Sequence, residues 1–364
     1  MELRYYIIRR LLLLIPTILG LTVLTFLLMR AFPNYQLVQG YINPHSSIPI
    51  SVQMLNAEQA LGLNYPPPIQ YIYYLKDLFQ GNWGQMSTTF YSGPVLRGIE
   101  YFFPNTVQLA LFAIILSIII AIPLGTYIGA RPNTAADQAG RVFSLAFYAM
   151  PTFWLALILQ IILGQDVIYG NPFGIFPIQG SFQPTSINPL HPPSWLINTQ
   201  LGTVLSSPTH LILFDALIHG DFAVASSAFM SLVLPVVTLT LTLLAGILRF
   251  VRAGMVDAAS QEYVKTARSK GVPERLVIKR HIRKNALIPT VTVLGLLFAS
   301  LLGGVVTIEY VFGYPGIGLF GLNAVLQNQI FGVMGTTLIF GLILVMANLI
   351  VDVVYALIDP RIRY

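Results

Sequence analysis

The sequence predicts an all-α membrane protein with six transmembrane helices and both termini in the cytoplasm. Three observations support this fold class: an apolar composition, several apolar runs of membrane-spanning length, and a one-sided distribution of basic residues. Of the 364 residues, 55% are hydrophobic and only 9% are charged, whereas soluble domains carry about 25% charged residues. So little charge could not solvate the surface of a globular domain, which places the chain in a lipid bilayer.

The first span follows a basic N-terminal cluster of Arg4, Arg9 and Arg10. An apolar run continues from Leu11 to Met29, and about 20 apolar residues suffice to cross roughly 30 Å of hydrocarbon. A secretory signal has a similar basic start, but no small-residue cleavage site follows this run. We therefore expect a retained first span with the N-terminus inside.

A long polar and aromatic segment, residues 31–103, follows the first span and is expected outside. Two short helices are predicted in it, over Val52–Leu61 and Ile69–Phe79, and Gly81 should end the second. Its tyrosines and Trp83 are typical of residues at headgroup level. The segment is either an interfacial cap over the spans or a contact surface for an external partner, and the sequence leaves both interpretations open.

The rest of the chain supplies five further spans. They are predicted at 105–129, 142–164, 226–248, 289–308 and within 330–358, with inside loops at 131–141 and 249–289 and outside loops at 165–225 and 309–329. This order divides the chain into a first span with its external segment (1–103), a five-helix membrane domain (104–358) and a cytoplasmic tail (359–364).

Basic residues divide unequally between the two sides. Only Arg30, Lys76 and Arg97 fall outside in this topology, and the other 17 of the 20 Lys and Arg fall inside. Because cytoplasmic loops collect Lys and Arg, the predicted topology also accounts for the net charge of +6. A nucleic-acid partner is not needed to explain this charge, and none is expected.

The segment Arg249–Pro289 holds ten of the 20 basic residues and lies between two apolar runs. Gly271 is a typical helix stop and Pro273 a typical first helical residue. We therefore expect a helix that ends near Lys270, a sharp turn, and a second helix that runs toward Asn285.

On the second of these helices, Arg275, Lys279 and Arg283 follow one another at intervals of four residues, which places them in one stripe. Two rigid helices below a membrane have a shape that a cytoplasmic partner could grip. The basic stripe could equally contact anionic lipid headgroups. The pattern of residues alone does not choose between these interpretations.

Several separated motifs resemble those of one family. The run Glu262–Gly271, followed by Asn285–Pro289, resembles the EAA loop of importer-type ABC permeases, and more narrowly that of the oligopeptide and dipeptide permease branch. Further stretches that match are Tyr6–Pro16, Leu61–Asn64, Gly81–Gly84, Ala149–Trp154, Glu309–Gly318 and Asp359–Tyr364. They occur in the order of the family and cover nearly the whole chain.

The resemblance implies a type I ABC importer permease fold, with residues 104–358 as the transmembrane permease domain, in a multi-pass protein of the cell membrane. It implies a second permease subunit, cytoplasmic ABC ATPase subunits and an external solute-binding protein as partners, besides the lipid bilayer. The chain itself would not be an enzyme, because ATP hydrolysis belongs to the separate ATPase. The substrate, moved by alternating access, would be an oligopeptide or dipeptide, with oligosaccharides and nickel also associated with this branch.

In this family the loop seats in a cleft of the ATPase and passes its motion to the spans. By resemblance, the ATPase-coupling residues of this chain are Glu262, Tyr263, Ala267, Arg268, Gly271, Pro273 and Pro289. The chain departs from the general consensus at Lys265 and Thr266. Its outside loop 165–225 is longer than the branch usually has, and the usual charged pair before the last span is missing near 327–332.

The substrate path is expected to involve Pro151 and Trp154 in the third span and Glu309 at the outer end of the fifth. Glu309 could line the entrance or be a solvated residue at a helix end. The predicted external loops are rich in Tyr, Trp, Asn and Gln but nearly free of Lys and Arg. This composition favours a neutral or zwitterionic substrate of several units.

No catalytic, cofactor-binding or metal site is expected. The chain has no Gly-x-x-x-x-Gly-Lys run to cradle nucleotide phosphates, no cysteine, and no histidines at metal-ligand spacing. The alternative function is an ion-coupled secondary carrier that works without an ATPase. Such a carrier requires ionisable residues at the centre of several spans, and the sequence has almost none there.

Overall fold

A computed structural model describes residues 3–43, 45–164, 174–178, 209, 211–220 and 222–358. The N-terminal part consists of helices α1 (Leu3–Arg30), α2 (Asn34–Leu37), η1 (Gln39–Tyr41), α3 (Ile50–Ala60) and α4 (Pro67–Phe79), and of strands β1 (Gln85–Ser87) and β2 (Ser92–Pro94). The remainder consists of α5 (Val95–Gly129), α6 (Ala135–Ala149), α7 (Thr152–Leu163), α10 (Ile212–Ile218), α11 (Phe222–Ala259), α12 (Glu262–Ser269), α13 (Glu274–Leu276), η2 (Val277–Ile282), α14 (Arg283–Val311), α15 (Ile317–Leu326) and α16 (Ile330–Ile358).

Four of the described helices are long and apolar enough to cross a membrane, or up to five if the bent pair α6 and α7 is one span. The spanning stretches lie in α1, α5, α11 and α16. Helix α14, 29 residues long, occupies the predicted fifth span but is not among these candidates. The mostly helical membrane fold is confirmed, whereas the count of six spans stays a prediction.

The predicted third span, residues 142–164, falls on two helices, α6 and α7, which are bent by 105° relative to each other. Pro151 lies at the break and has no backbone N–H to continue the helix. The residue before a proline is pushed out of the helical region, and Met150 is extended with a ψ of 126°. The prediction of a turn over residues 131–141 was partly wrong, because α6 already begins at Ala135.

Helices α5 and α11 pack closely together along the centre of the molecule. A Cβ built on Gly125 would lie 2.8 Å from the Cβ of Val251, and one built on Gly129 would lie 2.6 Å from that of Met255. Val251 and Met255 are fully buried. The two glycines therefore allow an approach that no larger residue permits without displacement. Helix α5 also runs unbroken across residue 103, where the sequence analysis divided the chain.

The predicted short helices of the first external segment are confirmed as α3 and α4, and Gly81 ends α4 with a φ of 79°. Helix α4 packs against α1. The hydroxyl of Thr22 shares a hydrogen bond of 2.9 Å with that of Tyr71, and the hydroxyl of Thr25 shares one of 2.9 Å with that of Tyr74. The antiparallel β1–β2 hairpin that follows was not predicted. Most of the predicted external loop 165–225 and the tail 359–364 lie outside the described residues.

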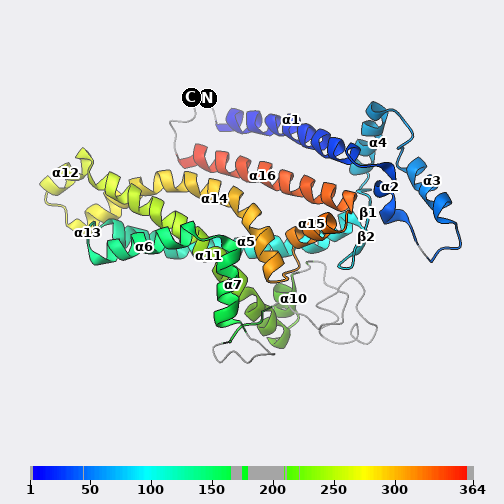
Figure 1. The fold of residues 1–364 in the computed structure, drawn as a ribbon. Helices are drawn as coiled ribbons and strands as arrows, with labels where there is room; N and C mark the ends of the chain where they lie inside the picture. Colours follow the sequence, from blue (N-terminus) through cyan, green and yellow to red (C-terminus); the bar gives the residue numbers. More distant parts are fainter. Residues whose placement is uncertain are drawn as a thin grey trace.

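The long helices give the molecule two distinct ends (Figure 1). The beginning of α1 and the end of α16 lie side by side and point toward the end that carries α6, α12 and α13. Helices α2 to α4, the hairpin and α15 lie at the opposite end. This division agrees with the grouping of segments that the basic residues predict, although the side of the membrane each end faces stays a prediction.

Candidate functional site: the loop between α11 and α14

Helix α12, which begins the loop, has one buried and one exposed face. Val264 and Ala267 are buried against the core, and Tyr263 is exposed. Glu262 is the first helical residue, where the positive end of the helix dipole stabilises an acidic side chain. Its carboxylate binds Lys265 Nζ at 2.8 Å and does not cap the helix, and its side chain is 85% exposed. The charged face of α12 is therefore open to a partner.

The turn after α12 depends on Gly271, as the sequence analysis predicted. Gly271 has a φ of 73°, a left-handed conformation that is costly for residues with a Cβ. Its N–H donates to the carbonyl of Arg268 at 2.9 Å, and Val272 N–H donates to that of Ala267 at 3.3 Å. A Cβ on Gly271 would meet no atom within 4 Å, so the requirement for glycine is conformational and not steric.

Arg268 and Glu274 connect the two sides of this turn. The guanidinium of Arg268 donates from Nη2 to Oε1 of Glu274 at 2.7 Å and from Nε to Oε2 at 3.1 Å. These hydrogen bonds lower the pKa of the Glu274 carboxyl. Both side chains are about half exposed, so the pair fixes the shape of the loop while contributing little to stability. Pro273 is the N-cap of α13, which begins at Glu274, one residue later than predicted.

The returning segment of the loop is not an α-helix throughout. Residues Val277–Ile282 form the π-helical segment η2, a rare geometry that often marks a functional site. Val277 and Ile282 are buried in the same core as Val264 and Met255. The wider π-turn also means that the stripe predicted for Arg275, Lys279 and Arg283 from regular α-helical spacing is not regular.

No helix begins at Pro289, and the predicted boundary between loop and span at this residue stays a prediction. Pro289 lies inside α14, which already begins at Arg283, so the second loop helix continues directly into the long helix. On the other side, α11 continues to Ala259, ten residues beyond the predicted start of the loop. At this point the two helices nearly touch, because a Cβ on Gly254 would lie 2.5 Å from the carbonyl oxygen of Ala286.

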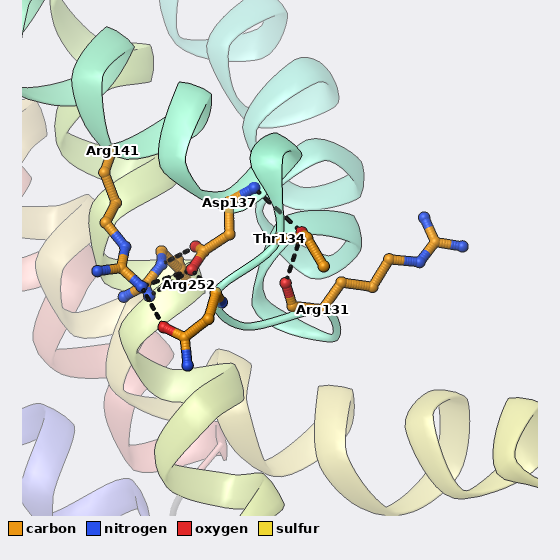
Figure 2. Close-up of polar contacts among 6 residues, drawn as sticks. Arg131, Thr134, Asp137, Arg141 and Arg252 are labelled. Carbon is orange, nitrogen blue, oxygen red and sulfur yellow. Dashed lines mark hydrogen bonds and ion pairs between the residues drawn. The ribbon is translucent and has the colours of Figure 1, made fainter.

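A buried carboxylate near the loop was missed by the sequence analysis (Figure 2). Asp137, in the first turn of α6, has no exposed side-chain surface. Its Oδ2 accepts from Arg141 Nη2 at 2.6 Å, from Arg252 Nη2 at 2.9 Å and from the Asn133 N–H at 2.9 Å. Its Oδ1 accepts from Arg252 Nε. One carboxylate of α6 thus binds an arginine of α11.

The sequence does hold a signal for Asp137. It is the one acidic residue between Glu100 and Asp166, and it lies three residues after Thr134, the N-cap of α6, whose hydroxyl accepts from the Asp137 N–H at 3.4 Å. A threonine followed at this spacing by an acid is typical of a helix start. The signal predicts the helix but not the partner, because Arg252 is 115 residues away.

The three residues predicted for the substrate path lie in different environments. Pro151 is exposed at the bend before α7, and Trp154 is half exposed on that helix. Glu309 is fully buried, so the interpretation of a solvated residue at a helix end was wrong. Its carboxylate contacts Thr106 and Leu319. A shared role of these residues in substrate passage stays a prediction.

Several long apolar helices joined by a compact, charged loop define a multi-pass membrane protein. The chain belongs to the family of binding-protein-dependent transport system inner membrane components, whose model matches residues 121–364. The matched part begins within α5 and includes both the loop and Asp137. This family confirms the ABC importer permease that the sequence motifs indicated and does not favour an ion-coupled carrier.

Individual relatives match over almost the full chain. The chain is 34% identical over 363 residues to the dipeptide transport system permease protein DppB of Alkalihalophilus pseudofirmus, with 99% of each chain covered. It is 33% identical over 359 residues to the oligopeptide transport system permease protein AppB of Bacillus subtilis, again with 99% of each covered. It is 32% identical over 362 residues to the di/tripeptide transport system permease protein DppB of Pseudomonas aeruginosa, covering 99% of this chain and 98% of the relative.

Proposed function

We propose that this permease imports short peptides by alternating access, driven by a separate ATPase that binds the loop from α12 to η2. The construction of this loop carries the proposal. Its apolar side is fixed in the core of the helix bundle, and Glu262 and Lys265 on its other side are exposed. The helices α12 and α13 of the loop lie at one end of the molecule (Figure 1). A partner that grips the charged side can therefore move the helices.

The buried contacts of the loop explain how such a motion would be transmitted. Val264 of α12 and Val277 and Ile282 of η2 pack in one cluster with Met255 of α11. Because packed interiors are dense and resist deformation, a displacement of α12 is passed to α11 and α14 and is not absorbed within the loop. A rigid-body change of this kind is a common basis of switching between two states.

The proposed substrate and partners follow from the relatives. The three relatives described above carry dipeptide, oligopeptide and di/tripeptide transport in their names, and the family name specifies dependence on a binding protein. We infer a second permease subunit, ATPase subunits and an external solute-binding protein as partners. The scarcity of basic residues in the predicted external segments supports a neutral or zwitterionic solute such as a peptide.

The coupling role is tested by Gly271→Val. Valine in a left-handed conformation costs about 1–2 kcal/mol, so the turn should change shape although no clash arises. We expect near-normal abundance in the membrane, reduced co-purification of the ATPase subunit and sharply reduced peptide uptake. Gly271→Asn is the matched control, because asparagine tolerates this conformation, and it should behave much like the parent.

Contact of the loop with lipid headgroups predicts a different pattern. Charge reversal at Arg275, Lys279 and Arg283 would then impair the protein, while Gly271→Val would have little effect. If Gly271→Val retains the ATPase and imports peptide like the parent chain, the coupling role of this loop is wrong. Competition of labelled dipeptide uptake by longer peptides and by a phosphorylated solute tests the substrate class, and preference for the phosphorylated solute would contradict it.

A further inference from the structure

The contact between Asp137 and Arg252 joins two helices at their ends nearest the loop. Asp137 lies in the first turn of α6, the helix that leads to the bend at Pro151 and on to α7. Arg252 lies about two turns before the end of α11 at Ala259, and α12 begins three residues further on. The contact therefore lies between the proposed receiver of motion and the bent pair of helices.

Both oxygens of the Asp137 carboxylate accept hydrogen bonds. Arg252 binds both carboxylate oxygens of Asp137 from Nε and Nη2, the bidentate geometry that gives the strongest arginine–carboxylate pairs. Arg141 and the Asn133 N–H use the remaining acceptor capacity of Oδ2. Among these described partners of Asp137, Arg252 alone lies on another helix, so its hydrogen bonds connect α6 to α11 (Figure 2).

Burial makes this contact expensive to open. Asp137 has no exposed side-chain surface, and the side chain of Arg252 is 21% exposed. Separation of the pair would leave a buried carboxylate without its main partner, which is strongly unfavourable. A contact of this kind is suited to remain closed through a transport cycle, in contrast to an exposed pair such as Arg268 with Glu274.

We propose that Asp137 and Arg252 form a permanent clamp, through which α6 and the adjoining end of α11 move as one body. Motion received by α12 then reaches the bend at Pro151 without slippage between the two helices. Asp137 is thus a positioning residue for the coupling of ATP hydrolysis to transport. This inference rests on the proposed function, because it requires an ATPase to act on α12.

The chain contains no cysteine, which permits a direct test. Asp137→Cys, Arg252→Cys and the double variant are purified with the second permease subunit, the ATPase and the binding protein and reconstituted in liposomes. The measured quantity is the ATP hydrolysed per dipeptide imported, which does not depend on how much protein has folded. The double variant is measured before and after its two thiols are joined by bis-maleimide linkers of increasing length.

We expect each single variant to raise the ATP hydrolysed per dipeptide by about fivefold or more. This value is the smallest fold-change typical of energetic coupling between two sites. Before linkage, the double variant should show the same raised ratio of ATP to dipeptide as the single variants. Once the best-fitting linker joins its two thiols, the ratio should return close to that of the parent chain. Arg131→Cys is the matched control, since Arg131 lies in the same turn but points away from the Asp137 carboxylate (Figure 2). It should keep the parent ratio with and without the reagent.

Two results would overturn the clamp. Recovery would fail with every linker if α6 and α11 must separate or slide during transport, and a normal ratio in Asp137→Cys would show that the contact has no part in coupling. Failure of the proposed function would look different, because even the parent chain would then neither retain the ATPase nor import dipeptide. That result would overturn the clamp as well.

Discussion

Thr106 of α5 donates a hydrogen bond of 2.5 Å to Oε1 of Glu309 in α14, across 203 positions of sequence. The same two side chains cap the N-terminus of α15. Leu319 N–H donates to Glu309 Oε2 at 2.9 Å, and Ile317 N–H donates to Thr106 Oγ1 at 2.8 Å. The first N–H groups of a helix have no partner within it. The pair therefore fixes α15 to both long helices at the end of the molecule opposite α12.

Replacement of Glu309 should destabilise this end. Glu309→Ala leaves buried donors of Thr106 and Leu319 without an acceptor, and each unsatisfied donor costs about 1–3 kcal/mol. We expect a clearly lower thermal unfolding temperature in detergent, with a smaller loss for Glu309→Gln, which keeps one acceptor oxygen. Glu100→Ala, at an exposed position of α5, is the control. An unchanged unfolding temperature for Glu309→Ala would show that α15 is held by other contacts.

Larger residues between α5 and α11 should also destabilise the protein. Gly129→Leu would force its side chain against Met255 and the carbonyl of Arg252, and overpacking of this kind costs about 1–3 kcal/mol. Gly20→Ala in α1, where a Cβ meets nothing within 4 Å, should be neutral or slightly stabilising. Abundance and thermal unfolding of both variants give the comparison, and equal behaviour would contradict the close approach of α5 and α11.

The turn at Gly271 should weaken in acid. Arg268 lowers the pKa of Glu274 below its ordinary value, which is about 4.3. Such a carboxyl adds stability above its unfolded-state pKa, and this stability is lost as the pH falls through the lower, folded-state pKa. Amide hydrogen exchange at residues 268–277 should therefore show less protection below about pH 4, after correction for intrinsic exchange rates. Glu274→Gln should remove this dependence, and its persistence would assign the effect to another group.

The orientation in the membrane can be tested by single cysteines in the cysteine-free chain. Because all basic residues but three fall on the predicted inner side, Lys270→Cys should be inside and Asn64→Cys outside. Both positions are exposed. In intact cells a membrane-impermeant maleimide should label Asn64→Cys alone, and after permeabilisation it should label both. Labelling of Lys270→Cys in intact cells would overturn the predicted topology.

Features set by local chemistry were predictable from the sequence. The stop at Gly271 and the helices α3 and α4 follow from glycine, proline and neighbouring residues alone. The motif from Glu262 to Gly271 likewise indicates the family through residues that are adjacent in the chain. Long apolar runs identified α1, α5, α11 and α16 because helical spans must satisfy their backbone groups internally.

Features set by distant contacts were not predictable. The sequence analysis noted Pro151 within the third span. Contacts with neighbouring helices decide whether a proline is tolerated within a span or ends the helix. The 105° bend was therefore missed. The hairpin has only three residues in each strand, too few for a clear alternating pattern. The π-helical form of η2 was not predicted either. Asp137 and Glu309 bind partners 115 and 203 residues away, which no local pattern indicates.

The crossing of Gly254 over the carbonyl of Ala286 has a mechanical consequence. Gly254 and Ala286 both lie inside long helices, so α11 and α14 are in close contact near the points where the chain leaves them for α12 and η2. If the loop receives motion as we propose, this contact would make the two helix ends turn together when the loop is displaced. A side chain at residue 254 would push the two backbones apart, and we expect it to weaken the transfer of motion to both helices.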